Sequence, residues 1–226
     1  MSVPEREEPI DVTADMLAPR PDERIDFEQG MRYAPPATLA LIAVLVSVFT
    51  WQVATGALAN RAAIIAAGAL VRDRVLAGEW WRLASAMVLH GSAEHLLGNC
   101  IALYIVGMAC EHALGSARML ALYAASGIAG SLASMLSGPG PSVGASGAIF
   151  GLMAAVIVVL VRFRDVYHVR DKRIALVLAG WAAYVLLTGL ADPMIDNAAH
   201  LGGLAAGALA GLLAQPCVRP KIVASQ

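Results

Sequence analysis

Charged side chains are scarce in this chain. Asp, Glu, Lys and Arg make up 15% of its 226 residues, whereas soluble domains carry roughly 25%. The deficit is concentrated in long uncharged runs, and 58% of the residues are hydrophobic. The composition therefore indicates an integral membrane protein that contacts the lipid bilayer. The net charge of −1 argues against a nucleic-acid partner, because binding to phosphates requires an excess of basic side chains.

Cysteine is also rare. Cys100, Cys110 and Cys217 are odd in number, lie in or beside apolar runs, and match neither a CxxC pair nor a zinc-binding pattern. We expect buried small hydrophobic residues rather than a disulfide framework or a metal site. The HExxH motif of zinc intramembrane proteases is absent. Ala148 stands where the GxSxG elbow of soluble serine hydrolases requires a second glycine, which excludes that elbow.

Residues 1–36 form an acidic segment ahead of the first uncharged run. They hold nine acidic and four basic side chains, several prolines and few large apolar groups. That composition cannot bury a core, so we predict a mostly disordered tail. No apolar core follows a basic start, so we do not expect a signal peptide. Residues 215–226 are expected to form a second, short tail.

Long uncharged runs between these tails are expected to form six membrane-spanning helices, since a span needs about 20 apolar residues. A Gly/Pro cluster at 137–141 divides one run that is too long for a single helix. The expected spans lie at 37–56, at 95–110, in the two halves of 119–161, at 174–191 and at 197–218. We therefore predict an all-α membrane protein with a six-helix bundle over 37–214.

Residues 57–93, after the first span, are predicted to lie in the membrane interface. Their apolar stretch Ala62–Val71 is too short to cross a bilayer. Trp80 and Trp81 stand beside Arg82, and amphipathic rings settle at the headgroup layer. This segment therefore fits a loop that lies on the membrane rather than through it.

Basic residues are distributed unevenly among the expected loops. The loops at 137–144 and 192–196 hold no Lys or Arg. The loop after the fourth span holds five, namely Arg162, Arg164, Arg170, Lys172 and Arg173. Because cytoplasmic loops are enriched in Lys and Arg, we predict that this loop and both termini are cytoplasmic.

Ser146 stands at the expected start of the fourth span, within Gly144-Ala145-Ser146-Gly147. The glycines leave its hydroxyl uncovered and allow another backbone to approach. The N-terminus of a helix also favours negative charge. A nucleophile and an oxyanion would both suit this position. The motif is open to a second interpretation, in which small residues simply pack helices together in the membrane.

Three further polar residues are expected at the depth of Ser146. His95 begins the second span, Asn99 follows one turn later on the same face, and His200 lies in the first turn of the sixth span. These spans run in the same direction, so all four side chains should lie toward the outer leaflet. Polar groups in hydrocarbon usually mark function. His95 as an interfacial residue and Asn99 as an interhelical hydrogen-bond donor remain alternatives.

This set of residues suits acyl transfer. A serine hydroxyl needs an adjacent base to act as a nucleophile, and a neutral imidazole can be that base. His200 is favoured, because the stripe Gly203-x-x-x-Gly207-x-x-x-Gly211 would let its helix pack closely against another. Asn99, His95 and the Ser146 backbone N–H could stabilise an oxyanion. Phe150, one turn after Ser146, could stack on the His200 ring or simply fill the core.

These motifs, in this order, resemble those of the rhomboid family of intramembrane serine proteases. Trp81-Arg82 precedes the segment from His90 to Asn99, which resembles the family's HxxxxHxxxN element. Glu111-x-x-x-Gly115 resembles the element that follows it. Gly144-x-Ser146-Gly147 matches the GxSG motif, and Ala199-His200 leads into a GxxxG helix. The resemblance covers about residues 37–214.

The resemblance implies a catalytic dyad of Ser146 and His200. It further implies an oxyanion hole made by His95, Asn99 and the Ser146 amide. Supporting roles are implied for His90, Phe150 and Gly144, and structural roles for Arg82 and Glu111. The family often has tyrosine where Phe150 stands, so no hydroxyl acts from that position. Asp196 is expected to be a loop residue, because the family uses no third acid.

The resemblance also implies cleavage of single-span or other membrane proteins near the outer ends of their transmembrane segments, without a metal or cofactor. It implies a multi-pass protein of the bacterial inner membrane. Two alternatives are a proteolytically silent relative that binds membrane clients and a transporter or channel. Silent relatives usually lack the serine or the histidine. A channel should carry polar residues into the cytoplasmic half of its spans, and these spans are apolar there.

Overall fold

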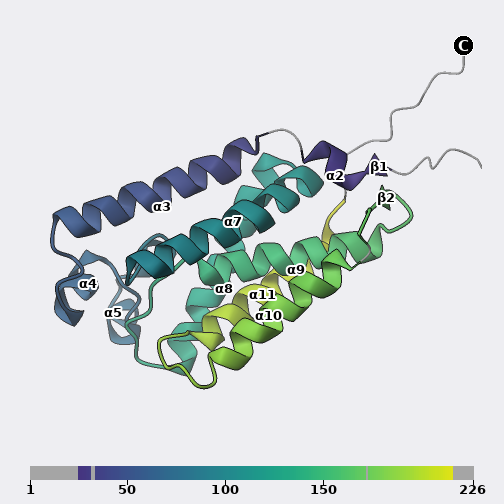
Figure 1. The fold of residues 1–226 in the computed structure, drawn as a ribbon. Helices are drawn as coiled ribbons and strands as arrows, with labels where there is room; N and C mark the ends of the chain where they lie inside the picture. The colour runs from purple at the N-terminus through teal and green to yellow at the C-terminus, as the bar shows by residue number, and fades with distance from the viewer. Residues whose placement is uncertain (1–24, 32–33, 172, 216–226) are drawn as a thin grey trace, which may run out of the picture.

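The computed structural model describes residues 25–31, 34–171 and 173–215, and this part of the chain is mostly helical (Figure 1). Its long helices are α3 (Pro36–Ala54), α7 (Ala93–Leu114), α8 (Ser116–Ser137), α9 (Ser146–Arg162), α10 (Ile174–Thr188) and α11 (Asn197–Leu213). Between α3 and α7 lie the short helices α4 (Arg61–Ala67), α5 (Arg72–Leu76) and α6 (Arg82–Ser85). The break between α8 and α9 falls at the predicted Gly/Pro cluster.

Three helices, α3, α7 and α8, are long and apolar enough to cross a membrane. Helices α9, α10 and α11 are apolar but shorter, with 17, 15 and 17 residues. Length and composition thus support three spans, and the count of six stays a prediction.

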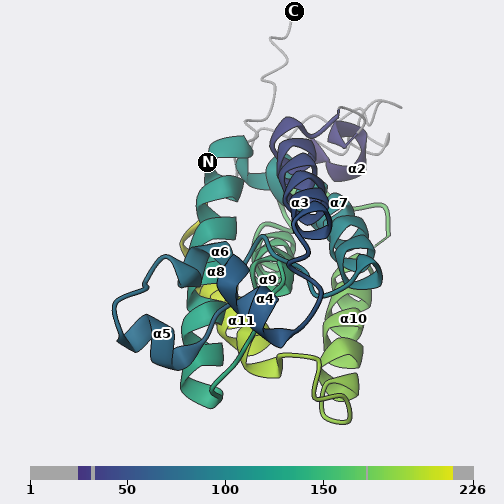
Figure 2. The ribbon, with the colours of Figure 1, turned by 90° about the vertical axis from the view of Figure 1, so that its left-hand side faces the viewer.

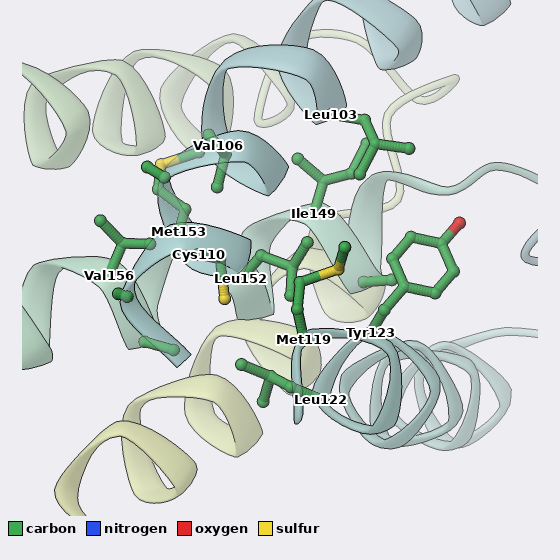
Figure 3. Packing of buried hydrophobic residues seen from close by; sticks show 14 of the residues in the cluster. Leu103, Val106, Cys110, Met119, Leu122, Tyr123, Ile149, Leu152, Met153 and Val156 are labelled. Carbon is green, nitrogen blue, oxygen red and sulfur yellow. The ribbon is translucent and has the colours of Figure 1, made fainter. Parts of the chain in front are cut away.

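Helix α9 lies at the centre of the bundle. Most of its residues are buried, and it packs against α7, α8, α10 and α11. Viewed from the end, α9 lies behind α4, between α8 and α11 on one side and α10 on the other (Figure 2). The surrounding core interleaves Leu103 and Val106 of α7, Met119 of α8, and Ile149 and Leu152 of α9 (Figure 3). Packing on all sides holds α9 in place, and Ser146 is the first residue of this helix.

Small residues allow α11 to approach α9 closely, as the glycine stripe predicted. A Cβ added at Gly203 would overlap the carbonyl oxygen of Gly147. A Cβ at Gly207 would overlap that of Gly151 in the same way. Backbone therefore packs directly on backbone along this contact, which is typical of membrane helices. This contact carries the first turn of α11, with His200, alongside the start of α9.

Glu111 joins α3 to α7. Its carboxylate accepts hydrogen bonds from the backbone N–H groups of Ala37 and Thr38, and from the Thr38 and Ser116 hydroxyls. The first N–H groups of a helix have no partner within it. Glu111, which is buried, therefore satisfies the N-terminus of α3, in agreement with its expected structural role.

The segment 57–93 folds around Arg82. Arg82 is 4% exposed, and its guanidinium donates to the carbonyl oxygens of Ile65 and Ala69 at 2.7 and 2.8 Å. It also pairs with Glu79, and its hydrogen bond holds the pKa of Glu79 below the usual value. Arg82 thus connects α4, the following turn and α6, as expected for a structural residue. Trp80 and Trp81 are exposed.

The prediction of a disordered tail over 1–36 is wrong for residues 25–31. Strand β1 (Ile25–Asp26) pairs in parallel with β2 (Tyr167–His168), and the short helix α2 (Phe27–Gly30) follows. Phe27 is fully buried, edge-on to the rings of His112 and Tyr167 at 5.2 and 5.3 Å. The average composition of the segment does not reveal this ordered part, because the single residue Phe27 makes the buried contact with His112 and Tyr167. This pair of strands also departs from the expected all-α fold. Residues 1–24, 32–33 and 216–226 lie outside the described residues.

Candidate active site

Ser146 and His200 meet across the contact between α9 and α11. The distance between Ser146 Oγ and His200 Nε2 is 2.8 Å, within normal hydrogen-bond range. Ser146 is the first residue of α9, and His200 lies in the first turn of α11. His200 is 4% exposed, and Ser146 is half-buried. The structure thus brings together the two residues that the sequence assigned to a nucleophile and its base.

Phe150 holds the plane of the His200 ring. The two rings stack with centroids 4.2 Å apart and planes inclined by 3°. A stacked ring cannot tilt without losing this contact, so Phe150 favours the orientation that points Nε2 at Ser146. The other ring nitrogen, Nδ1, is buried and has no hydrogen-bond partner among the described residues. Among the described residues, no carboxylate therefore accepts a hydrogen bond from this imidazole.

Gly144 makes room for the ring of His95. Its φ angle is +135°, a conformation that other residues rarely adopt. A Cβ added at this position would lie 2.7 Å from Cε1 and 2.9 Å from Nε2 of His95, and 3.8 Å from Ser146 Oγ. The imidazole of His95 therefore lies against the backbone just ahead of Ser146. Only glycine permits both the backbone angle and the close approach.

Asn99 lies one turn beyond His95 on α7 and is 5% exposed. Its side-chain NH2 donates to the carbonyl oxygen of His95 at 3.1 Å. An amide NH2 has two hydrogens, so this bond orients the group and leaves the second N–H for another acceptor. The side chain of Asn99 faces the same cavity as His95, Ser146 and His200.

His90 supports the site from behind. It is fully buried, and its ring meets the His95 ring edge-on with centroids 5.2 Å apart. Burial, followed by the neighbouring His95, lowers the pKa of His90 to about 4, so its imidazole is neutral at pH 7. Gln52 of α3 holds the backbone of His90 through two hydrogen bonds. Its side-chain amide donates to the His90 carbonyl and accepts from the His90 N–H, both at 3.1 Å.

The sequence analysis missed two residues at this site. Gln52 is a fully buried polar residue in an uncharged, apolar span. A polar group within such a span usually indicates a functional role. Asp196 does lie in the loop before α11, as expected, but the analysis gave it no further role. It is the N-cap of α11, and its carboxylate accepts a hydrogen bond from the Ala199 N–H at 2.9 Å. The Asp–Asn pair ahead of a small-residue helix is a capping signal that could have identified it.

A cavity of about 1060 Å³ leads to the dyad. Its lining includes the polar side chains of His95, Asn99, Ser146 and His200. Its lining also includes Trp181 and Val185 of α10 and residues of the loop between α10 and α11. A lining that mixes polar and apolar side chains suits an apolar segment that carries a reactive amide. Across the described residues, no group of three His, Cys, Asp or Glu side chains is arranged to hold a metal ion.

This arrangement provides the parts of acyl transfer. The Ser146 hydroxyl has a base at hydrogen-bond distance, as nucleophilic catalysis requires. Ser146, His95 and Asn99 all line the cavity, and each of them carries an N–H group that can donate a hydrogen bond. Donors on one side of a nucleophile can stabilise the negative charge that develops on an attacked carbonyl oxygen.

Comparison with known proteins identifies the family of this chain. Residues 77–216 match the family described as Rhomboid domain. The chain is 37% identical over 190 residues to Rhomboid protease GluP of Bacillus subtilis, a match that covers 83% of this chain and 36% of that protein. It is 34% identical over 197 residues to Rhomboid protease AarA of Providencia stuartii, covering 76% and 70%. It is 42% identical over 164 residues to RHOMBOID-like protein 5 of Arabidopsis thaliana, covering 69% and 52%. The chain thus spans about a third, two thirds and half of these relatives.

Proposed function

Because the chain belongs to the rhomboid family, we propose that it is a serine-type endopeptidase that hydrolyses peptide bonds in or near the transmembrane segments of other membrane proteins. The single observation that carries this proposal is the 2.8 Å contact between Ser146 Oγ and His200 Nε2 at the end of a cavity. A family member that only bound clients would not need to keep a hydroxyl and an imidazole in this geometry.

Ser146 is the nucleophile of the proposed reaction. Its Oγ attacks the carbonyl carbon of the scissile bond while His200 Nε2 takes its proton. The carbonyl oxygen becomes an oxyanion, and the proposed donors are the Ser146 backbone N–H, the His95 ring and the free N–H of Asn99. Each donor of this kind contributes about 10²- to 10³-fold to the rate. The bond from Asn99 to the His95 carbonyl supports this role, because it holds the amide in one orientation.

His200 then returns the proton to the leaving amine. The C–N bond breaks, and the new amino terminus departs. The remaining acyl group is an ester on Ser146 Oγ. Water reaches the ester through the polar side of the cavity, His200 takes a proton from it, and hydrolysis frees the carboxylate and restores the serine. Stacking on Phe150 supports both proton transfers, because it keeps Nε2 directed at the reacting atoms.

The substrate is proposed to be a single-span or other membrane protein. The cavity lining combines the polar side chains of the site with the apolar side chains Trp181 and Val185. A transmembrane helix that unwinds at the cut would place its apolar side chains against Trp181 and Val185 and its exposed backbone against the polar side chains. Hydrolysis also needs water at membrane depth, where irregular backbone is tolerated only beside a polar cavity.

The topology completes the proposal. The chain is an integral membrane protein, with α3, α7 and α8 long enough to span. We extend this to six spans by including α9, α10 and α11, with the domain over 37–214. Both termini lie in the cytoplasm of a bacterial inner membrane, as the basic loop after α9 favours. The segment 57–93 then lies in the outer interface, since it follows the first span.

The test is cleavage by the purified protein in liposomes. A single-span substrate with small residues near the outer end of its helix is reconstituted with wild type, Ser146→Ala or His200→Ala. Matched controls are Ser47→Ala, on the exposed face of α3, and His168→Ala, beyond the opposite end of α9. We expect both dyad variants to lose cleavage while they keep the wild-type melting temperature, and both controls to cleave normally. Cleavage by Ser146→Ala would refute the proposal.

A further inference from the structure

Asp196 links α11, α8 and the loop before α9 close to Ser146 and His200. One carboxylate oxygen caps α11 by accepting from the Ala199 N–H at 2.9 Å. The other accepts from the hydroxyl of Ser142 at 2.6 Å and from the hydroxyl of Ser134 at the end of α8. A carboxylate acceptor makes these bonds stronger than those between neutral groups. The N-terminus of α11 is therefore held to α8 and to the loop that leads into α9.

Ser142 is itself held on its other side. Its backbone N–H and C=O both pair with Leu70, at 3.0 and 2.9 Å. Two residues later, the Gly144 N–H donates to the Ala86 carbonyl at 2.8 Å. These bonds attach the loop to the segment between α3 and α7. The loop that carries Ser146 is thus fixed to the protein from one side and to Asp196 from the other.

The two attachments occupy matching places in the sequence. Ser142 lies four residues before Ser146, and Asp196 lies four residues before His200. Resting on the dyad proposed above, we propose that Asp196 is a positioning residue, which sets the distance between Ser146 and His200 by holding the start of α11 against the loop before α9. The 2.6 Å bond between Asp196 and Ser142 and the 2.8 Å contact between Ser146 and His200 then fix two neighbouring points of the same contact.

The packing of α11 on α9 explains why such a hold is needed. Gly203 and Gly207 lie directly on the backbone of Gly147 and Gly151. Glycines permit the close approach but supply no side-chain ridge that would lock one helix along the axis of the other. Hydrogen bonds at the helix end supply the missing register. A displacement of about 1 Å can lower a rate about 10²-fold.

Among the described residues, Asp196 makes no hydrogen bond to the imidazole of His200. Its described hydrogen bonds go to Ala199, Ser142 and Ser134, and His200 Nδ1 has no partner among the described residues. A third catalytic acid would accept a hydrogen bond from Nδ1. The carboxylate therefore differs from the acid of a catalytic triad, and its replacement by an amide should have a different effect.

The experiment compares Asp196→Ala with Asp192→Ala. Asp192 lies in the same loop, is exposed, and accepts only a local bond from the Met194 N–H among the bonds described. Three quantities are measured in detergent: the melting temperature, kcat and KM for a single-span substrate, and the rate at which a fluorophosphonate labels Ser146 without substrate. We expect Asp196→Ala to lower kcat and the labelling rate in parallel by about 10- to 100-fold, with KM unchanged. Asp192→Ala should match wild type in all three.

Two further variants separate positioning from other roles. Asp196→Asn keeps an oxygen for the Ala199 N–H and an NH2 that the serine hydroxyls can accept from, so we expect it to recover most of the labelling rate. Ser142→Ala keeps the cap of α11 and should lower labelling in the same direction. The double variant Ser142→Ala with Asp196→Ala should be no slower than Asp196→Ala alone, because residues acting through one bond are not additive.

Several results would overturn the inference. These are wild-type labelling in Asp196→Ala, an effect on melting temperature or KM alone, additive losses in the double variant, or Asp196→Asn as slow as Asp196→Ala, which would indicate a third acid. If Asp196→Ala does not fold, wild-type labelling in Ser142→Ala overturns it instead. The dyad itself is tested separately: cleavage by Ser146→Ala refutes the proposed function, whereas an inactive Ser146→Ala beside a fully active Asp196→Ala refutes only the positioning role.

Discussion

Replacement of Gly144 by alanine should show how much the position of the His95 ring contributes to the rate. The added Cβ would lie 2.7 Å from His95 Cε1, whereas ordinary contacts begin at 3.4 Å. The imidazole must therefore move by about 0.7 Å, or the loop must move with Ser146. The φ angle of +135° adds backbone strain of about 1–3 kcal/mol.

The expected loss of rate follows from that displacement. A shift of about 1 Å at a reacting group lowers a rate about 10²-fold, and complete loss of one oxyanion donor lowers it about 10²- to 10³-fold. We therefore expect Gly144→Ala to lower kcat by about 10- to 100-fold on a single-span substrate. Labelling of Ser146 by a fluorophosphonate should fall by a similar factor, because its tetrahedral product also needs the donors.

A matched control isolates the contact from the strain. Gly78 has a φ angle of +105°, and a Cβ added there would meet nothing within 4 Å. Gly78→Ala should therefore lower the melting temperature as Gly144→Ala does, while its kcat stays at the wild-type value. Equal kcat in Gly144→Ala and wild type would refute the assigned contact between Gly144 and His95. Equal losses of kcat in both variants would attribute the effect to backbone strain.

Three further predictions concern oxyanion stabilisation and the framework. Asn99→Ala should lower kcat about 10²- to 10³-fold with the fold retained; a wild-type rate would leave Asn99 a packing residue. Glu111→Ala should destabilise the protein by roughly 3 kcal/mol, because it leaves two buried N–H groups of α3 without an acceptor. Thermal unfolding of the reconstituted protein measures this, and an unchanged melting temperature would contradict it. Phe27→Ala should release the segment 25–31 at a cost of about 3 kcal/mol, seen as faster limited proteolysis there, with labelling of Ser146 unchanged. Slow proteolysis as in wild type would show that the β1 pairing suffices.

Much of the site could be read from the sequence, because membrane helices restrict what a residue pattern can mean. Uncharged runs of the right length predict helices, and helices that run in the same direction place their first turns at one depth. Ser146, His95 and His200 each begin such a helix. The glycine stripe of α11 also predicted a close helix contact, and Gly203 on Gly147 confirms it.

Other features were not readable because they depend on contacts between distant residues. Asp196 looks like any acidic loop residue until Ser142 and Ser134 are seen to donate to it. Phe27 lies in an acidic segment whose composition indicates disorder, and only its contacts with His112 and Tyr167 bury it. Gln52 brackets His90 from 38 residues away. Such hydrogen bonds leave no periodic trace along the chain.

The sequence by itself determined which polar residues stand at the starts of the apolar helices, because apolar runs and helix starts are local properties of the chain. Tertiary structure alone decided that the hydroxyl of Ser146 lies 2.8 Å from Nε2 of His200 and that Phe150 stacks on that ring. The reason is physical. The relative placement of two packed helices depends on how their surfaces fit together, and this fit depends on all the residues in the contact at once.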